Sequence, residues 1–184
     1  MGKIHLPKPV KLFVGMLSPE PALFGTCTGL LNAEYGPVDL QSEISPWTFT
    51  DYYAEEMGSV LLRKFVFFEQ LMDPAHLADV KIFTTRIEEK MSDKTGVSLK
   101  RRINLDPGYI TEAKVVLAST KDFSHRIYIG KGIYAEVTLQ YKARSHTFTA
   151  LEHTYPDFRS QESLSMFNVG REMLRKAPLP RQVR

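Results

Sequence analysis

Hydrophobic residues are spaced as in β-strands along most of the chain. The segment "VKLFVGML" (residues 10–17) is a short apolar run and predicts a central strand. The segment "SVLLRKFVFFEQ" (residues 59–70) is rich in branched and aromatic residues and predicts a second strand. Polar and apolar residues alternate in several shorter segments, which predict strands at residues 38–44, 97–105, 112–118, 126–129, 132–142 and 146–156. A tight turn around residues 130–132 predicts that two of these strands form a hairpin.

Three other segments carry the spacing of helices. Residues 19–36 predict a helix that ends at Gly36, and residues 73–91 predict a second helix capped by Asp73. A third helix is predicted over residues 161–176. Residues 48–58 fit either one helical turn or an extended link. Residues 92–96 and the segment "DPGY" (residues 106–109) have turn chemistry and predict two turns.

The order of these elements predicts an α+β fold. The first part reads β-α-β-β-α-β, which is the split βαβ arrangement of ferredoxin-like folds. The second part predicts an antiparallel β extension followed by a C-terminal helix, so that helices pack on one sheet. The sequence has no internal repeat and no low-complexity linker. We therefore expect a single domain over residues 1–184, with residues 177–184 as a loose tail.

Composition narrows the class of protein. A hydrophobic fraction of 43% and a charged fraction of 24% are typical of a globular protein. The apolar runs are too short to span a bilayer, and the N-terminal residues lack the apolar core of a signal peptide, so we expect a cytoplasmic protein without a membrane partner. The single cysteine, Cys27, excludes an intramolecular disulfide and a zinc site built from several cysteines.

The polar positions of the predicted strands are unusual in their residue types. Side chains alternate between the two faces of a strand, so in residues 132–142 the odd positions form an apolar side and the even positions, including Tyr134 and Glu136, a polar side. A solvated sheet face would explain the alternation alone. The presence of Arg, Asn and Tyr side chains, however, favours a face that orients an anionic or planar ligand.

Candidate site residues follow from this polar face and from the turns at its ends. The candidates for ligand binding carry cations, amides or phenols: Arg102, Asn104, Lys114, Lys121, Arg126 and Tyr134. The candidates for moving a proton or holding Mg²⁺ are His125, Glu136, Asp106 and Asp122. Considered alone, His125 could equally be a solvent-exposed residue of the turn at the start of a strand, without a functional role. No His-x-x-x-His spacing supports a zinc site of the metalloprotease type, and the chain has no P-loop.

Several long segments resemble a known family. They are "PKPVKLFVGMLSPEPALF", "TDYYAEEMG", "RRINLDPGYI", "KVVLASTKDFSHRIYIGKGIYAEVTL" and "TYPDFRS". These segments resemble the signature segments of the family catalogued as domain of unknown function 4416, from Pro7 to Arg175. The resemblance implies a stand-alone bacterial protein, and some relatives carry a GTP-binding label. It assigns no role to individual residues.

The leading hypothesis is a small cytosolic domain that binds a phosphorylated or nucleotide-like ligand on its polar sheet face, with Mg²⁺-dependent catalysis as an extension. It requires Lys114, Arg126 and Glu136 to meet in one pocket. One alternative is an RNA-binding module that stacks bases on exposed tyrosines of the sheet. Another is a structural or interaction protein with Trp47 and Phe49 in an interface. The sequence leaves the metal and the oligomeric state open.

Overall fold

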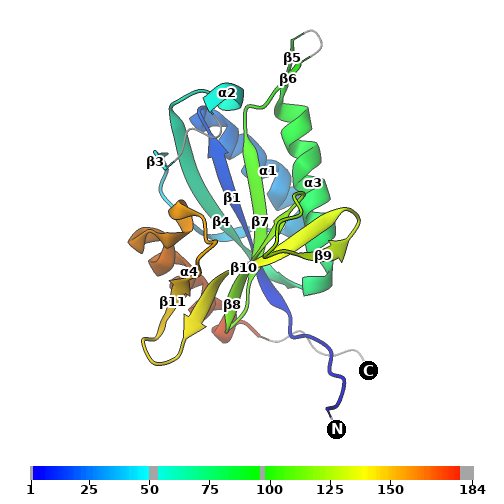
Figure 1. Ribbon diagram of the computed structural model, residues 1–184, viewed down its shortest axis with the longest axis vertical. Coiled ribbons are helices and arrows are strands. Elements are labelled where there is room, and N and C mark those ends of the chain that lie inside the picture. Colours follow the sequence, from blue (N-terminus) through cyan, green and yellow to red (C-terminus); the bar gives the residue numbers. More distant parts are fainter. Residues whose placement is uncertain (1, 50–53, 96–97, 179–184) are drawn as a thin grey trace.

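A computed structural model describes residues 2–49, 54–95 and 98–178 (Figure 1). The strands of its main sheet are β1 (Val10–Ser18), β2 (Val38–Gln41), β3 (Ser45–Trp47), β4 (Leu61–Met72), β7 (Asn104–Ile110), β8 (Lys114–Ser119), β9 (Ile127–Gly130), β10 (Ile133–Lys142) and β11 (Thr147–Ala150). The helices are α1 (Pro21–Tyr35), the short α2 (Ala54–Met57), α3 (Leu77–Met91) and α4 (Gln161–Lys176), with 3₁₀ turns η1 (Pro74–His76) and η2 (Pro156–Arg159). The predicted α+β class is confirmed.

The described strands of the main sheet lie in the order β11-β10-β8-β7-β1-β4-β2, with β3 paired to β4 and β9 paired to β10. β4 lies between β1 and β2 and is antiparallel to both, while β7 is antiparallel to β1 on its other side. A separate hairpin, β5 (Asp93–Thr95) with β6 (Ser98–Lys100), projects beyond the sheet at the end of α3 (Figure 1).

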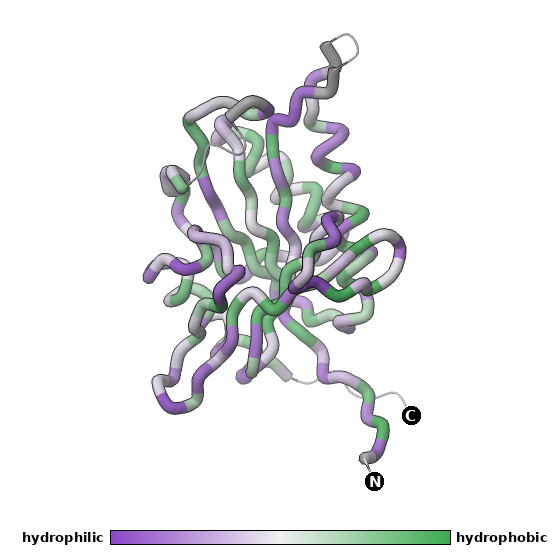
Figure 2. Tube along the Cα trace, viewed as in Figure 1, coloured by the Kyte–Doolittle hydropathy of each residue, from purple (hydrophilic) through white to green (hydrophobic). Residues whose placement is uncertain are grey.

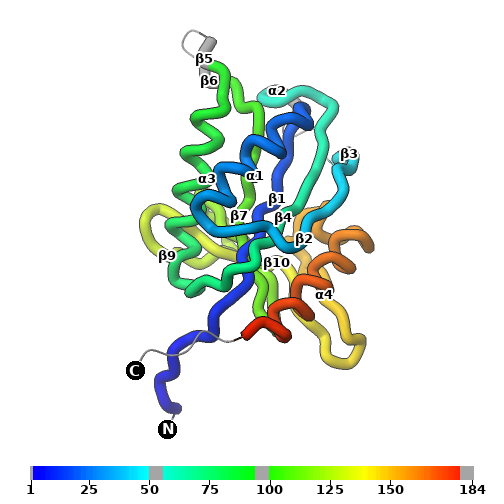
Figure 3. The backbone as a smooth tube through the Cα atoms, turned by 180° about the vertical axis from the view of Figure 1, so that it is seen from behind, coloured from blue at the N-terminus to red at the C-terminus, as the bar shows by residue number. Residues whose placement is uncertain are grey.

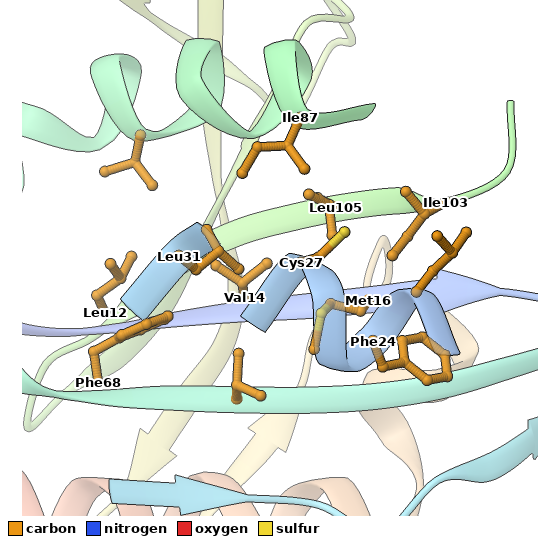
Figure 4. Packing of buried hydrophobic residues seen from close by; sticks show 13 residues of the cluster. Leu12, Val14, Met16, Phe24, Cys27, Leu31, Phe68, Ile87, Ile103 and Leu105 are labelled. Carbon is orange, nitrogen blue, oxygen red and sulfur yellow. The ribbon is translucent and has the colours of Figure 1, made fainter. Parts of the chain in front are cut away.

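Helices α1 and α3 lie together on one face of the sheet (Figure 3). Alternate residues of β1 point toward them, because successive side chains of a strand face opposite sides. Figure 4 shows the resulting core, in which Leu12, Val14 and Met16 meet Phe24, Cys27 and Leu31 of α1 and Ile87 of α3. Figure 2 shows hydrophobic and hydrophilic residues along the strands of the sheet.

Helix α4 and turn η2 pack on the opposite face, which we call the α4 face. Phe13 of β1 contacts Phe167 of α4 edge to face, with ring centroids 5.0 Å apart, and Phe65 of β4 contacts Phe158 of η2 at 5.3 Å. Strands β4 and β7 carry polar residues further along this face, at Arg63 and Asp106. The aromatic core therefore occupies one part of the α4 face and a polar group occupies another.

The turn predicted at residues 106–109 is wrong, because these residues lie inside β7. Gly108 serves close packing there: a Cβ at this position would lie 2.4 Å from the carbonyl oxygen of Val116 and 2.5 Å from the ring of Phe13. Pro107 precedes the first residue of β7 that pairs with β8, so its missing N–H costs that pairing no hydrogen bond. Two residues that are common in turns are thus accommodated inside a strand, and Gly108 is needed there for close packing.

The predicted alternation across residues 132–142 is also wrong in its second half. The register of β10 against β8 shifts between Val137 and Leu139, so Thr138 is the extra residue of a β-bulge. Leu139 therefore joins the core of the α4 face, whereas Ile133 packs in a cluster with residues of α3. The bulge places Glu136 and Leu139 on the same face of the sheet.

The three long helices are confirmed as α1, α3 and α4. Asp73 caps the 3₁₀ turn η1 that precedes α3, rather than α3 itself, and accepts a hydrogen bond from the backbone N–H of Ala75. The strand predicted over residues 97–105 is instead divided between β6 and β7, and residues 96–97 lie outside the described part. Residues 54–57 form the helical turn α2, while residues 50–53 and most of the predicted loose tail, residues 179–184, lie outside the description. No helix of the described residues is long and apolar enough to cross a membrane.

Candidate functional site

The polar part of the α4 face borders a cavity of about 380 Å³, which we call the arginine cavity. Its floor is formed by strands β1, β4, β7 and β8. Its walls come from Trp47 of β3, the loop before β9 and the turn η2. The charged residues that line it are Arg63, Asp106, Lys121, Arg126 and Asp157. Aromatic side chains of Trp47, Phe123, Tyr155 and Phe158 complete the lining.

Arg63 lies across the floor of this cavity. Its side chain starts on β4, passes over Gly15 of β1 and reaches Asp106 on β7, where Nη1 donates to Oδ2 at 3.2 Å. Its Nε lies 3.1 Å from Oδ2 of Asp157 on η2. A Cβ at Gly15 would lie only 2.5 Å from Nη2 of Arg63, so glycine is required for this path. The arginine thus ties η2 to the sheet through two carboxylates.

Arg126 is the second buried arginine, and its side chain is only 1% exposed. Nε donates to Oε2 of Glu136 at 2.7 Å, and Nη2 donates to the hydroxyl of Tyr155 at 2.9 Å. Nη1 donates to Oγ of Ser119 at 2.7 Å and to the carbonyl oxygen of Lys121 at 3.1 Å. Burial alone would lower the pKa of Arg126, but its bonds to Glu136 and Tyr155 raise it above the usual range. Arg126 therefore stays charged and fixed in position.

Glu136 links Arg126 to a pair of histidines. Its Oε2 also lies 3.0 Å from Nε2 of His125, while no hydrogen-bond partner of its Oε1 is found among the described residues. The ring of His125 stacks on that of His153, with centroids 4.3 Å apart. A buried carboxylate that holds one ring nitrogen of a histidine orients that histidine for proton transfer. His125 itself does not line the arginine cavity.

The structure brings together several of the predicted site residues. Asp106, Lys121 and Arg126 line the cavity, and Glu136 and His125 contact Arg126 or each other behind it. Asn104 supports the floor, because its Nδ2 donates to Oδ2 of Asp106 at 2.8 Å.

The other predicted residues lie elsewhere. Arg102 forms ion pairs with Glu20 and Asp93. Tyr134 of β10 contacts Tyr128 of β9 and Asp122 of the loop before β9. Lys114 is exposed at the opposite end of β8 from Ser119. The expected pocket of Lys114, Arg126 and Glu136 therefore does not form as a whole, since only the last two meet.

The predicted Mg²⁺ ligands do not converge either. Asp106 is bonded to Arg63, Asp122 is beside Tyr134, and Glu136 is bonded to Arg126. Within residues 2–49, 54–95 and 98–178 there is no group of three or more His, Cys, Asp or Glu side chains that could hold a metal ion. The described part of the site is thus built from ion pairs between arginines and carboxylates.

A family model matches residues 8–174 of the chain. The chain belongs to the DUF4416 family. This family is described as a domain of unknown function, and the resemblance seen in the sequence is confirmed. No curated protein and no solved structure matches the chain. All residues that line the arginine cavity lie within the range that the DUF4416 model matches.

Several residues that line the cavity of this DUF4416 protein were not predicted as site residues, among them Arg63, Ser119, Tyr155 and Asp157. Arg63 lies in the segment of residues 59–70, which was predicted to be a strand because of its apolar residues. Asp157 lies shortly before the helix predicted over residues 161–176, where an aspartate commonly serves as a cap. One feature of the sequence pointed to Arg63. This residue is charged, yet it lies on the same face of its strand as Phe65 and Phe67, which belong to the aromatic core. A charge in such a row requires a buried partner, and that partner comes from η2, almost a hundred residues later in the chain.

Proposed function

We propose that the arginine cavity binds a small anionic ligand with a planar group, such as a phosphorylated or nucleotide-like molecule. The observation that carries the proposal is Arg126, a guanidinium held rigidly inside a cavity with aromatic walls. An arginine has five N–H donors, and four hydrogen bonds of Arg126 to described residues are found. No partner of the remaining donor, on Nη2, is found among the described residues, and we assign this donor to an anionic group of the ligand beside Tyr155.

The guanidinium groups of the lining support a ligand with a phosphate or carboxylate group. Arg63 is paired with Asp106 and Asp157, and Arg126 is paired with Glu136 behind the cavity. The support therefore comes from the N–H donors of these guanidinium groups and not from an excess of positive charge. Guanidinium groups suit such anions because their donors match the spacing of two oxygens.

The shape and the other lining residues support a planar group beside the anion. Trp47, Phe123 and Tyr155 offer aromatic surfaces, and Phe123 already packs on the guanidinium of Arg126, whose Cζ lies 4.6 Å from the ring centroid. A volume of about 380 Å³ lies in the range of roughly 300–1,000 Å³ that is typical of small-molecule sites. His125 and Glu136, the predicted pair for proton transfer, lie behind Arg126 and do not line this cavity, so the proposal is limited to binding.

The test is a binding screen with inorganic phosphate, nucleoside monophosphates and sugar phosphates, read by thermal stabilisation and by titration calorimetry. Arg126→Ala alone would leave Glu136 buried without its cation, so the informative variant is the double change Arg126→Ala with Glu136→Gln. Lys114→Ala is the matched control, because it removes a cation of β8 outside the cavity. We expect wild type and the control to bind equally and the double variant to bind at least about ten-fold more weakly, a loss of about 1.4 kcal/mol.

RNA binding has less support as the function. Helices α1 and α3 cover one face of the sheet and α4 covers part of the other, so the broad exposed sheet that this hypothesis needs is reduced. Tyr128 and Tyr134 do pack edge to face on the β9–β10 hairpin, where bases could stack. Affinity for single-stranded RNA that falls steeply with salt and survives the Arg126 and Glu136 changes would favour RNA and contradict the arginine cavity as the site.

A further inference from the structure

Two hydroxyl groups of the arginine cavity accept hydrogen bonds from Arg126. Nη1 of Arg126 donates to Oγ of Ser119 at 2.7 Å, and the backbone N–H of Lys121 donates to the same oxygen at 3.1 Å. Nη2 of Arg126 donates to the hydroxyl oxygen of Tyr155 at 2.9 Å. Ser119 and Tyr155 both line the cavity. The direction of these bonds decides what the two hydroxyls can offer a ligand, because a hydroxyl has one donor and two acceptor positions.

The proton of each of these hydroxyls has no acceptor among the residues that the structure describes. Two N–H groups fill both acceptor positions of Ser119 Oγ, so its O–H points in the direction that remains. A guanidinium cannot accept a hydrogen bond, so the O–H of Tyr155 points away from Arg126. Ser163 of α4 differs, because its Oγ donates to the carbonyl oxygen of Asp157 at 2.7 Å. Ser119 and Tyr155 therefore keep one proton each for a ligand.

The carboxylates of the cavity lining belong to the other arginine. Asp106 and Asp157 are both paired with Arg63, which crosses the floor. The carboxylate that pairs with Arg126 is that of Glu136, and it does not line the cavity. The carbonyl oxygen of Lys121, a further acceptor near Arg126, already accepts from its Nη1 at 3.1 Å. Around Arg126 the lining thus offers a ligand N–H and O–H donors.

We infer that Ser119 and Tyr155 make the arginine cavity selective for an oxyanion that carries no proton, such as a sulfate ester or a fully ionised phosphate ester. This inference rests on the proposed function, because it specifies the anionic group that Arg126 binds. Every oxygen of such a group accepts hydrogen bonds. A singly ionised phosphate ester bears a P–OH group as well, and beside Arg126 its proton would face other donors and lose the hydrogen bond that it makes to water.

Phenyl sulfate and phenyl phosphate test this selectivity at equal charge and with the same planar group. At pH 5 each carries one negative charge, but phenyl phosphate keeps a P–OH group, because the second pKa of a phosphate ester is about 6. We expect titration calorimetry at pH 5 to show phenyl sulfate binding wild type at least about five-fold more tightly, a difference of about 1 kcal/mol. At pH 7.5 phenyl phosphate has lost its proton, and the preference should disappear. Both ligands are compared at the same pH, so titration of His125 and His153 affects them alike.

The double variant Ser119→Ala with Tyr155→Phe removes both hydroxyls. Water that replaces them can turn to accept the P–OH proton, so the ratio of the two affinities at pH 5 should fall to within about two-fold of unity, or about 0.4 kcal/mol. Tyr155→Phe alone, at a side chain that is 42% exposed, should lower the ratio part of the way and serves if the double variant does not fold. The matched control is Ser145→Ala with Tyr128→Phe, whose hydroxyls lie outside the cavity, and it should keep the wild-type ratio.

The ratio separates selection by the two hydroxyls from a structural role in holding Arg126. If Ser119 and Tyr155 only position Arg126, the variants weaken both ligands equally and the ratio stays at its wild-type value, which would overturn the inference. Equal binding of the two ligands to wild type at pH 5, or tighter binding of phenyl phosphate, would show that a carboxylate such as Asp106 accepts the P–OH proton. Either result would overturn the inference and leave the proposed function standing. Absence of binding by both ligands and by the whole phosphate panel would overturn the proposed function and this inference with it.

Discussion

Replacing Arg63 with methionine tests whether the ion pairs at the floor of the arginine cavity hold η2 on the sheet. The methionine side chain follows a similar path over Gly15 and keeps apolar contact with Phe65 and Phe158, on whose rings the guanidinium now lies. The change therefore removes the charge, its hydrogen bond to Asp106 and its ion pair with Asp157 while leaving little empty space. Asp106 and Asp157 then lose their common cation.

The expected cost follows from the surroundings of the two carboxylates. The side chain of Asp157 is only 9% exposed and, apart from Arg63, forms no ion pair with a described residue. Asp106 is 25% exposed and keeps its bond from Asn104, so it tolerates the loss better. Removing one partner of a buried ion pair lowers the free energy of unfolding by about 3–5 kcal/mol. Because water partly reaches the two carboxylates from the cavity, we expect a loss of about 3 kcal/mol here. Adding Asp157→Asn removes the unpaired charge and should restore about 1–2 kcal/mol.

Urea denaturation followed by far-ultraviolet circular dichroism measures these differences in the free energy of unfolding, provided the slopes with urea are equal. Lys8→Met is the control, because Lys8 pairs with Glu112 at 3.4 Å on the surface and exposed pairs contribute about 0–1 kcal/mol. A cost of Arg63→Met below about 1 kcal/mol would contradict the reasoning. So would a double variant that is as unstable as Arg63→Met, because the unpaired charge of Asp157 would then not be the cause.

Three further predictions concern other parts of the fold. Gly108→Ala should lower the free energy of unfolding, measured by urea denaturation, by about 1–3 kcal/mol, because the added Cβ meets the backbone of β8. Gly25→Ala in α1 is the control, since its Cβ enters open space and should raise the free energy of unfolding by up to about 1 kcal/mol. Equal effects of the two changes would contradict this prediction. Burial raises the pKa of the Cys27 thiol to about 11, so a thiol reagent at pH 8 should label it only after urea is added, and rapid labelling of the folded protein would disprove its burial. The Arg102 guanidinium lowers the pKa of Glu20, so this pair stabilises the fold at neutral pH and its contribution disappears as the pH falls through the lowered pKa. In acid titrations Glu20→Gln should therefore be less stable than wild type at pH 7 and equal to it at the acid end.

Much of the fold could be predicted from local pattern, because the signals lie within single elements. The helix over residues 161–176 is reproduced to the residue as α4, and its amphipathic spacing alone predicted it. The segment "DPGY" failed for a different reason: Pro and Gly also serve strands where another chain segment passes close by, and Phe13 and Val116 create that need at Gly108. The bulge at Thr138 likewise depends on the partner strand β8, so no pattern within β10 could locate it.

The candidate site could be predicted only in part, and the division has a physical basis. Arg126, Glu136 and His125 lie within twelve residues of one another, so a hairpin joins them whatever the rest of the chain does. The contact between Arg63 and Asp157 joins residues far apart in the sequence, and it depends on how η2 packs on the sheet. Lys114 was grouped with Arg126 because both are cations of neighbouring strands. The alternation of residues in a strand predicts on which face of the sheet a side chain lies, but it does not predict which residues of other strands lie beside it.

The buried ion pairs of the α4 face agree with the proposal of a ligand site. Replacing a buried ion pair with apolar residues of similar size is often neutral or stabilising, so these pairs are a weak source of folding energy. The adjoining part of the same face shows the apolar alternative, with Phe13, Phe67 and Phe167 packed edge to face. Arg63 and Arg126 instead line a cavity with charged groups that are already desolvated and fixed by their carboxylates. Such preorganised cations bind an anion without a further ordering cost, which is the property that the proposed site requires.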